Sequence, residues 1–196
     1  SYDPDHEITV LSGATEAIAA CMLGLLNPGD RVLLLEPFYD SYPACAAMAG
    51  AEVDYLPLKR QDLGVDWDGL QALLSPATRL LVLNTPGNPH GKVWSLAELE
   101  QLAQLLRRYP NLLVMTDEVY EHIVFAPARH FTLASLPDMR ERTLVVSSFS
   151  KTLSMTGWKV GYVFAPPALT AAVRASHQFL TFCSASPLQA ALAASL

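Results

Sequence analysis

The chain has 196 residues, of which 51% are hydrophobic and 16% charged, a composition typical of one globular domain with a substantial buried core. Its formal net charge of −6 argues against nucleic-acid binding, which needs Lys and Arg gathered on one face. The apolar runs are far shorter than the ~18 residues of a membrane-spanning helix. We therefore expect neither a nucleic-acid nor a membrane partner.

The three cysteines bear on metal binding and compartment. Cys21, Cys45 and Cys183 are widely spaced among Ala, Met and Phe, which is typical of buried structural thiols, with a metal or redox role as the alternative. The residues before Ile8 are polar and acidic and do not resemble a signal peptide. We predict no metal site and a cytoplasmic location, where thiols stay reduced.

Short apolar runs alternate with longer stretches of helical period, which is the pattern of an α/β sheet covered by helices on both faces. In chain order, we expect strand Ile8–Leu11, helix Thr15–Leu25, strand Arg31–Glu36, helix Tyr42–Met48, strand Glu52–Leu56, helix Trp67–Leu74, strand Arg79–Asn84, helix Leu96–Arg108, strand Leu112–Thr116, strand Thr143–Ser147, strand Val160–Phe164, helix Pro167–Leu180 and helix Pro187–Ser195. No repeat or linker divides these elements, so a single unit is predicted. The final helix is apolar enough to pack on something that follows it, and we expect the chain to be a fragment.

The first chemical motif lies where the strand ending at Leu11 meets the next helix. Its sequence, Ser12-Gly-Ala-Thr-Glu-Ala, combines a glycine turn with exposed amides at a helix N-terminus, which is a suitable place for an anion such as phosphate. The alternative is an ordinary capped helix, because Ser or Thr followed by Glu within one turn is a common capping pattern.

A second motif follows another strand, where Asp117 and Tyr120 stand at the carboxyl edge of the predicted sheet. Open α/β sheets hold their ligands at this edge, and Asp117 could hold a proton on the nitrogen of a heterocycle. The alternative is a turn carboxylate that caps the next segment.

The third motif is Ser147-Ser-Phe-Ser-Lys-Thr, in which Lys151 follows a strand end. A lysine amine near a sheet edge and a second cation is a credible nucleophile, and Lys159 could supply that charge and also pair with a phosphate. The alternative for both lysines is a surface role. Lys59 and Lys92 lie in polar loops and are predicted to be solvated.

Two further segments complete the set. Tyr39, in an aromatic stretch after a strand, could stack on a flat ring, and the turn from Asn84 to Pro89 presents amides. Core packing and turn formation are the alternatives. The conjunction of all five features at strand ends in one chain favours a single site.

Together these motifs resemble the class I, fold type I aminotransferases, which depend on pyridoxal 5'-phosphate, and within them the kynurenine and methionine aminotransferase-like branch. The resemblance runs through essentially the whole chain. It is carried by Ser12-Gly-Ala-Thr-Glu-Ala, Glu36-Pro-Phe-Tyr-Asp-Ser-Tyr, Asn84-Thr-Pro-Gly-Asn-Pro-His-Gly-Lys-Val-Trp, Thr116-Asp-Glu-Val-Tyr-Glu-His and Ser147-Ser-Phe-Ser-Lys-Thr-Leu-Ser-Met-Thr-Gly-Trp-Lys-Val-Gly-Tyr. It implies a three-layer α/β/α large domain with a mostly parallel seven-stranded sheet, spanning residues 1–196.

The resemblance also implies roles for individual residues. Lys151 would form the Schiff base to the cofactor, and Asp117 would pair with the pyridine nitrogen so that the ring acts as an electron sink. The remaining cofactor contacts would be Tyr39 rather than Phe38 on the ring face, Tyr120 and Asn88 at the phenolic oxygen, and Gly13, Ala14, Thr15, Ser148 and Lys159 at the phosphate.

By the same resemblance, the function is transfer of an amino group from an amino acid to a 2-oxo acid, with methionine, aromatic or other large apolar donors favoured. The alternatives are a cysteine-conjugate β-lyase of the same fold and a non-catalytic cofactor-binding domain of a regulator. The family's leading segment and its trailing small domain, with the arginine that grips the substrate carboxylate, are not in this sequence. We therefore expect the chain alone to be inactive or weakly active, and the full-length protein to be a homodimer.

Overall fold

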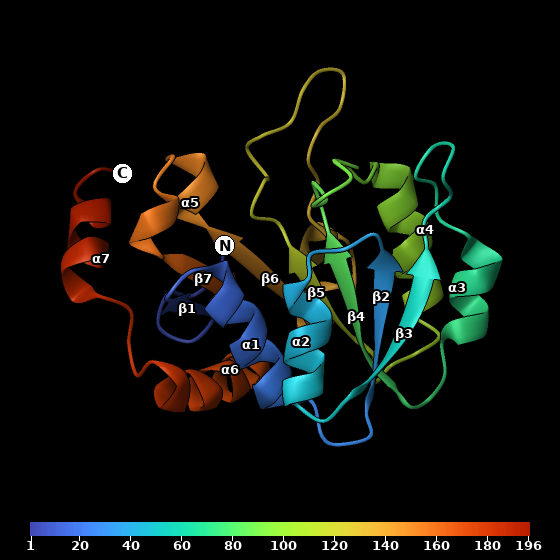
Figure 1. Ribbon diagram of the computed structural model, residues 1–196, viewed down its shortest axis with the longest axis horizontal. Helices are drawn as coiled ribbons and strands as arrows, with labels where there is room; N and C mark the ends of the chain where they lie inside the picture. The colour runs from blue at the N-terminus through green and yellow to red at the C-terminus, as the bar shows by residue number, and fades with distance from the viewer.

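The strands form one seven-stranded sheet, seen in a computed structural model that describes residues 1–196 (Figure 1). Across the sheet the strand order is β1-β7-β6-β5-β4-β2-β3. The strands are β1 (Ile8–Leu11), β2 (Arg31–Glu36), β3 (Glu52–Pro57), β4 (Thr78–Asn84), β5 (Leu113–Asp117), β6 (Thr143–Ser148) and β7 (Gly161–Phe164). Only β7 runs antiparallel to its neighbours, β1 and β6, so the predicted mostly parallel sheet is confirmed.

Helices cover both faces of this sheet, as predicted. On one face lie α1 (Ala14–Leu25), α2 (Ser41–Met48) and α6 (Pro167–Leu180), and α1 packs against both of the others. Figure 1 looks onto α1 and α2, which lie side by side. The other face is covered by α3 (Trp67–Leu73) and α4 (Leu96–Leu106), while α7 (Ser186–Ala193) ends the chain. None of the helices combines the length and hydrophobicity needed to span a bilayer.

The strand sequences explain why both faces are covered. Successive side chains of a strand point to opposite faces, and β2 places Val32 and Leu34 in the core beneath α1, but Leu33 and Leu35 in the core beneath α4. A strand buried on both faces therefore appears as a continuous apolar run rather than an alternating one.

Element boundaries differ from the predictions by up to two residues, with physical causes. Helix α4 ends at Leu106 rather than Arg108, because the amides of Arg108 and Tyr109 donate to the carbonyls three residues earlier, Leu105 and Leu106, so that the last turn tightens. Its start is fixed by a capping box, in which the Ser95 side chain accepts from the amide of Glu98 and the Glu98 carboxylate accepts from the amide of Ser95.

One α-helix was not predicted, nor were three short 3-10 helices at Leu133–Ser135, Arg140–Arg142 and Thr156–Trp158. Residues Phe149–Thr152 form the single turn α5, where a loop was expected. A turn of this length has too few residues to show helical periodicity. It forms because the Ser148 hydroxyl accepts a hydrogen bond of 3.1 Å from the amide of Ser150.

Two expectations about single residues are wrong. Cys183 is exposed, whereas Cys21 and Cys45 are buried as predicted, because Cys183 falls in the turn between α6 and α7 rather than on a helix face. Lys92 is not solvated: only 8% of its side chain is exposed, and its Nζ lies 2.6 Å from Glu98. The capping box of α4 holds Glu98 within reach, a contact that the polar loop sequence does not reveal.

Candidate active site

The predicted site residues gather around one cavity of about 160 Å³ at the carboxyl ends of the central strands. Those lining it are Ala14, Thr15, Tyr39, Asn88, Asp117, Tyr120, Ser148, Lys151 and Lys159. Gly13 does not line the cavity but immediately precedes Ala14. Four lining residues were not predicted, namely Ile18, Val119, Ser150 and Thr156. The gathering follows from topology, because the carboxyl ends of parallel strands meet at one edge of the sheet.

One corner of the cavity, between Gly13 and Lys159, has groups that could hold an anion. Gly13 precedes α1 with φ of 85°, a conformation that favours glycine, and the amides of the first turn have no partner within the helix. Gly161 allows β7 to approach closely, since a Cβ there would lie 2.6 Å from the carbonyl carbon of Gly13. Lys159 completes this corner, because its Nζ would be 3.3 Å from a Cβ placed on Gly13.

The capping alternative for this corner is only partly met. Helix α1 begins without any side-chain cap at Gly13. Instead, Glu16 reaches back from the first turn and accepts a hydrogen bond of 2.5 Å from the amide of Ser12. The Thr15 hydroxyl is left near the cavity, 3.4 Å from the hydroxyl of Tyr39.

Lys151 lies in the short helix α5 rather than on an irregular loop. The capping hydroxyl of Ser148 also donates a hydrogen bond of 3.0 Å to the carbonyl of Val160, which ties the start of α5 to the strand beside it. The half-buried Lys151 extends its Nζ to 6.0 Å from the ring centre of Tyr120. The amine is therefore held on the same side of the cavity as the phenol.

Asp117 is the last residue of β5 and is buried, with 5% of its surface exposed. The Tyr42 hydroxyl donates a hydrogen bond of 2.7 Å to its Oδ2, and the amide of Val119 donates one of 3.2 Å to its Oδ1. Burial raises the pKa of Asp117 to about 6, although both hydrogen bonds act to lower it. The turn-capping alternative is thus also realised, but it uses only one oxygen of a carboxylate that faces the cavity.

Aromatic and amide groups form the remaining walls. Tyr39 lines the cavity, while Phe38 stacks on Tyr55 at a ring separation of 5.7 Å and lies outside it. Asn88 is held by its own amide, which donates a hydrogen bond of 2.6 Å to the side chain of Asn84. Burial, and then the charge of Asp117, raise the pKa of Tyr120, so its phenol stays neutral over a wide pH range.

Sequence reasoning missed Tyr42, which makes the shortest contact to Asp117. Its signal in the sequence is only its place in the same aromatic stretch as Tyr39, which precedes α2, so helical spacing does not relate the two rings. The two rings meet edge to face, with centroids 5.8 Å apart and planes at 88°. Tyr42 therefore supports both the carboxylate and the aromatic wall.

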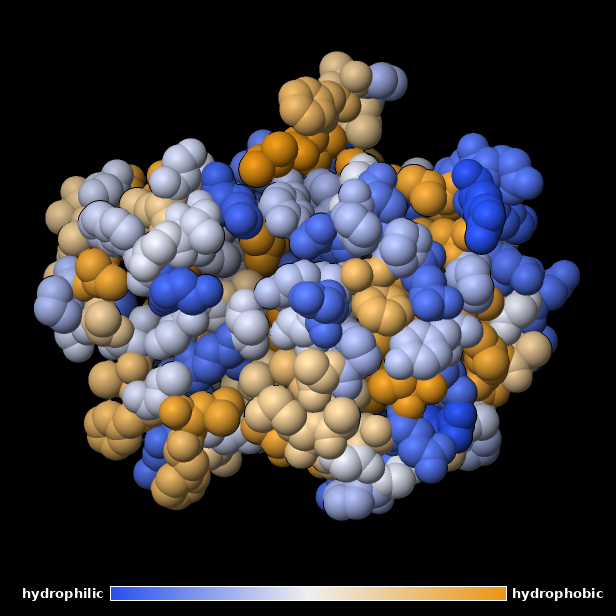
Figure 2. Space-filling view, viewed as in Figure 1, coloured by the Kyte–Doolittle hydropathy of each residue, from blue (hydrophilic) through white to orange (hydrophobic).

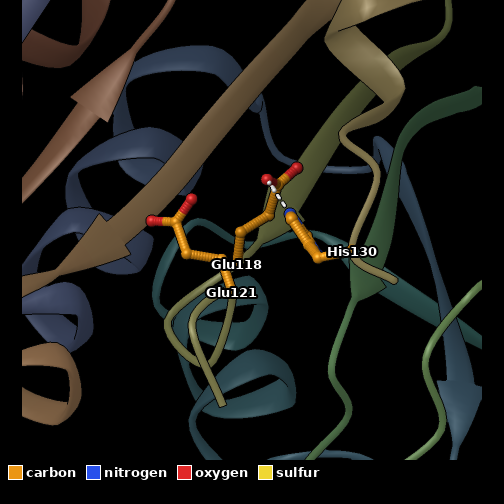
Figure 3. A group of neighbouring side chains, drawn as sticks. All are labelled: Glu118, Glu121 and His130. Atoms are coloured by element: carbon orange, nitrogen blue, oxygen red, sulfur yellow. Dashed lines mark hydrogen bonds and ion pairs between the residues drawn. The ribbon is translucent and has the colours of Figure 1, made fainter. Parts of the chain in front are cut away.

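A second polar cluster, in the segment that follows β5, consists of Glu118, Glu121 and His130 (Figure 3). Its carboxylates are already engaged by protein groups. Glu118 contacts His130 Nε2 at 2.8 Å and accepts from the Thr132 hydroxyl at 2.7 Å, and Glu121 accepts from the Ser147 hydroxyl at 2.7 Å. The cluster thus ties both ends of the loop after β5 to the body of the domain.

That loop borders an apolar groove of about 510 Å³ next to the cavity. Asn88 and Tyr120 line both hollows, so the two are neighbours. Val93, Ile123 and Phe125 supply apolar surface to the groove, and 82% of Phe125 is exposed. In Figure 1 the loop rises above the strands, and in Figure 2 its surface is largely hydrophobic.

The comparisons with known proteins agree on one family. The model of the family "Aminotransferase class I and II" matches residues 1–196. The methionine aminotransferase of Escherichia coli is 46% identical over 97% of this chain, and the kynurenine–oxoglutarate transaminase 3 of Rattus norvegicus is 40% identical over 97% of it.

Solved structures give the same result. A structure of the methionine aminotransferase YbdL from Escherichia coli superposes with a TM-score of 0.96 at 45% identity, covering 99% of this chain and 51% of that one. The N-succinyldiaminopimelate aminotransferase from Mycobacterium tuberculosis has a TM-score of 0.95 at 48% identity, covering 100% of this chain and 51% of that one. The chain spans about half the length of the curated relatives it matches, 49% for the methionine aminotransferase and 44% for the kynurenine transaminase. With its mostly parallel α/β sheet, the chain belongs to the class I and II aminotransferase family, of fold type I.

Proposed function

We propose that the protein is a pyridoxal 5'-phosphate-dependent aminotransferase that moves an amino group from an amino acid to a 2-oxo acid. The observation that carries this proposal is the arrangement of three unlike groups around one cavity: the amine of Lys151, the buried carboxylate of Asp117, and the anion corner at Gly13. No single group is diagnostic. Together, the amine would meet the aldehyde of the cofactor, the carboxylate its ring nitrogen, and the anion corner its phosphate.

The chemistry of the donor set fits this cofactor. Asp117 is buried, its two hydrogen bonds come from neutral groups, and no Lys, Arg or His forms an ion pair with it. A buried carboxylate without a cation is costly, and a protonated ring nitrogen would supply the missing charge. In the anion corner, Lys159 and the first-turn amides of α1 would donate hydrogen bonds to a phosphate dianion.

When bound, pyridoxal phosphate supplies an aldehyde that condenses with amines and a ring that withdraws electrons from the substrate α-carbon. Lys151 would hold the cofactor at rest and, once displaced by the substrate amine, would act as the base that moves the α-proton. Asp117 would keep the ring nitrogen protonated. Tyr120 and Asn88 would bind the phenolic oxygen, and Tyr39 would stack on the ring face.

We assign the phosphate to the corner formed by Gly13, Ala14, Thr15, Ser148 and Lys159. Its support is the glycine conformation at Gly13 and the position of Lys159 beside it. Thr15 would contribute its hydroxyl, which caps nothing in α1.

Large apolar or aromatic amino acids are the donors we favour. The support is the apolar groove beside Asn88 and Tyr120, which lies next to the cavity and offers Val93, Ile123 and Phe125 to a substrate side chain. The methionine aminotransferase among the relatives points the same way.

The proposal has three further parts. Residues 1–196 form the cofactor-binding large domain, the full-length protein is a homodimer, and its location is cytoplasmic. A single sheet running through the whole chain supports the first. The buried free thiols of Cys21 and Cys45 are compatible with a reducing compartment.

Borohydride reduction tests the central assignment. The purified protein is mixed with pyridoxal phosphate, reduced, digested and mapped by mass spectrometry, and we expect the label on Lys151. Lys151→Ala should abolish the label, whereas Lys59→Ala, at an exposed position, should leave it unchanged. A label on Lys159 or Lys92 would show that the assignment is wrong.

Product analysis tests the reaction. With methionine and a 2-oxo acid, a transaminase forms the keto acid of methionine and a new amino acid without releasing ammonia. Pyruvate and ammonia from a cysteine conjugate, with no exchange of amino groups, would identify a β-lyase instead. Because the 196-residue chain alone is expected to be inactive or weakly active, the reaction is tested on the full-length protein, where cofactor binding without turnover of any amino acid would favour a regulatory domain.

A further inference from the structure

A buried hydrogen-bonded pair of side chains, Glu16 and His177, adjoins the turn that forms the anion corner. Glu16, in the first turn of α1, and His177, in the last turn of α6, are each only 10% exposed at their side chains, and Glu16 Oε1 lies 2.7 Å from His177 Nδ1. Thr181 donates its hydroxyl to the same oxygen at 2.9 Å. These groups are 161 residues apart in the sequence, so only the packing of α1 against α6 brings them together (Figure 1).

The second oxygen of Glu16 holds the turn itself. Oε2 accepts the 2.5 Å hydrogen bond from the amide of Ser12, the residue before Gly13. The amide of Gly13 is also occupied, because it donates to the carbonyl of Leu11 at 2.8 Å. The amides left for an anion are therefore those that follow, from Ala14 onward.

One carboxylate thus joins two structures that the anion corner needs. With Oε2 it fixes the backbone before Gly13, and with Oε1 it anchors the first turn of α1 to the end of α6. A carboxylate held at both oxygens has one orientation, and its hydrogen bonds keep it directed away from the cavity, where its charge would oppose a phosphate.

We propose that Glu16 and His177 are positioning residues for the phosphate of the cofactor: they hold the turn from Ser12 to Thr15 in the shape that presents its amides. The inference rests on the proposed function, since it assumes that the anion is the phosphate of pyridoxal phosphate. Neither residue lines the cavity, so both act through the backbone of the turn.

A comparison of two ligands tests the inference. Pyridoxal has the aldehyde and the ring of pyridoxal phosphate but no phosphate, so only pyridoxal phosphate uses the anion corner. Binding of each is measured by the absorbance change on titration of the purified protein and its variants. We expect Glu16→Gln and His177→Gln each to weaken binding of pyridoxal phosphate by about tenfold or more, which is the effect of losing one charge-assisted hydrogen bond between the turn and the phosphate. Binding of pyridoxal should change by less than about twofold.

The variants are chosen so that a folding defect cannot imitate the result. Glu7→Gln is the matched control, because Glu7 is also a largely buried carboxylate in an ion pair, with Arg140 at 2.8 Å, but lies at the far end of β1. Thr181→Val removes a single hydroxyl from the same network and keeps the test available if the other variants do not fold. In the double variant of Glu16 and His177, the loss should be smaller than the sum of the two single losses, since both single variants disrupt the same contact between Glu16 and His177.

The outcomes separate the two proposals. Equal losses for pyridoxal and pyridoxal phosphate, or no loss for either, would overturn the positioning role while leaving the proposed function intact. If the unaltered protein bound neither compound, the proposed function would fall, and the inference with it. A selective loss for pyridoxal phosphate, absent in Glu7→Gln, supports the assignment.

Discussion

The hydrogen bond between Tyr42 and Asp117 is expected to control the charge of the buried carboxylate. Tyr42→Phe removes one hydroxyl and leaves the ring, which is 1% exposed and packed in the core. Because the phenol donates to Asp117 Oδ2 at 2.7 Å, it stabilises the ionised carboxylate more than the neutral one. The variant should therefore hold a proton on Asp117 at higher pH.

The size and sign follow from the burial of the pair. A hydrogen bond to a charged group contributes about 1.5–3 kcal/mol, which corresponds to a rise of about 1–2 in the pKa of Asp117. In the unaltered protein that pKa is about 6, above the ordinary 3.8. The folded state thus binds a proton more tightly than the unfolded chain, and the stability contributed by protonated Asp117 is full below about pH 4 and is lost as the pH rises to about 6. In Tyr42→Phe this loss should continue to about pH 7–8.

Urea unfolding of the cofactor-free protein across a range of pH measures the effect. At pH 9, Tyr42→Phe should be less stable than the unaltered protein by about 1.5–3 kcal/mol, and at pH 4 the two should nearly coincide. In an Asp117→Asn background the same substitution should show no dependence on pH. An equal loss at pH 4 and pH 9 would refute the reasoning, because it would mean that the hydroxyl serves packing and not the charge.

Two further predictions concern Asp117 and Gly13. Asp117→Asn should stabilise the cofactor-free protein at pH 7 by about 3 kcal/mol in urea unfolding, since it removes a buried charge whose pKa burial has raised to about 6. In the full-length protein the same substitution should cost several kcal/mol of transition-state stabilisation, and unchanged turnover there would contradict the assignment of the carboxylate. Gly13→Ala should weaken binding of pyridoxal phosphate by about tenfold or more, because φ is 85° there and the new Cβ would press on Lys159. Gly29→Ala is its control in calorimetric titration, since Gly29 has φ of 89° with nothing within 4 Å, and equal losses of affinity in both variants would attribute the effect to backbone strain in general.

Much of the fold could be predicted because the elements are long enough to show their periods. Each predicted strand and helix is present, and the ends that moved did so where a local contact outweighs the pattern. Helix α5 escaped prediction because one turn has no period, although it carries Lys151.

The candidate site was largely predictable for a different reason. Residues that follow parallel strands meet at one edge whatever their distance in sequence, which is why Lys151 and Asp117 line the same cavity. No comparable rule predicts from the sequence which side chains meet where two helices pack together. The pair of Glu16 and His177 depends on how α6 lies on α1, and the burial of Lys92 depends on a carboxylate in the next helix. The roles of the site residues stay predictions until they are measured.

The position of β1 at the edge of the sheet has a consequence for the order of folding. Its only neighbour is β7, so that Ile8 pairs with Phe164 across 156 positions of the chain. During synthesis at roughly 5–20 residues per second, β1 is made well before β7 and must wait for it. Closing so long a loop is slow, and the apolar segment Ile8–Leu11 is exposed to association in the meantime. The turn at Gly13 directly follows this strand, so the anion corner is completed only when β1 docks. A ligand bound there favours the docked state by mass action, so an anion in this corner would also stabilise the pairing of β1 with β7.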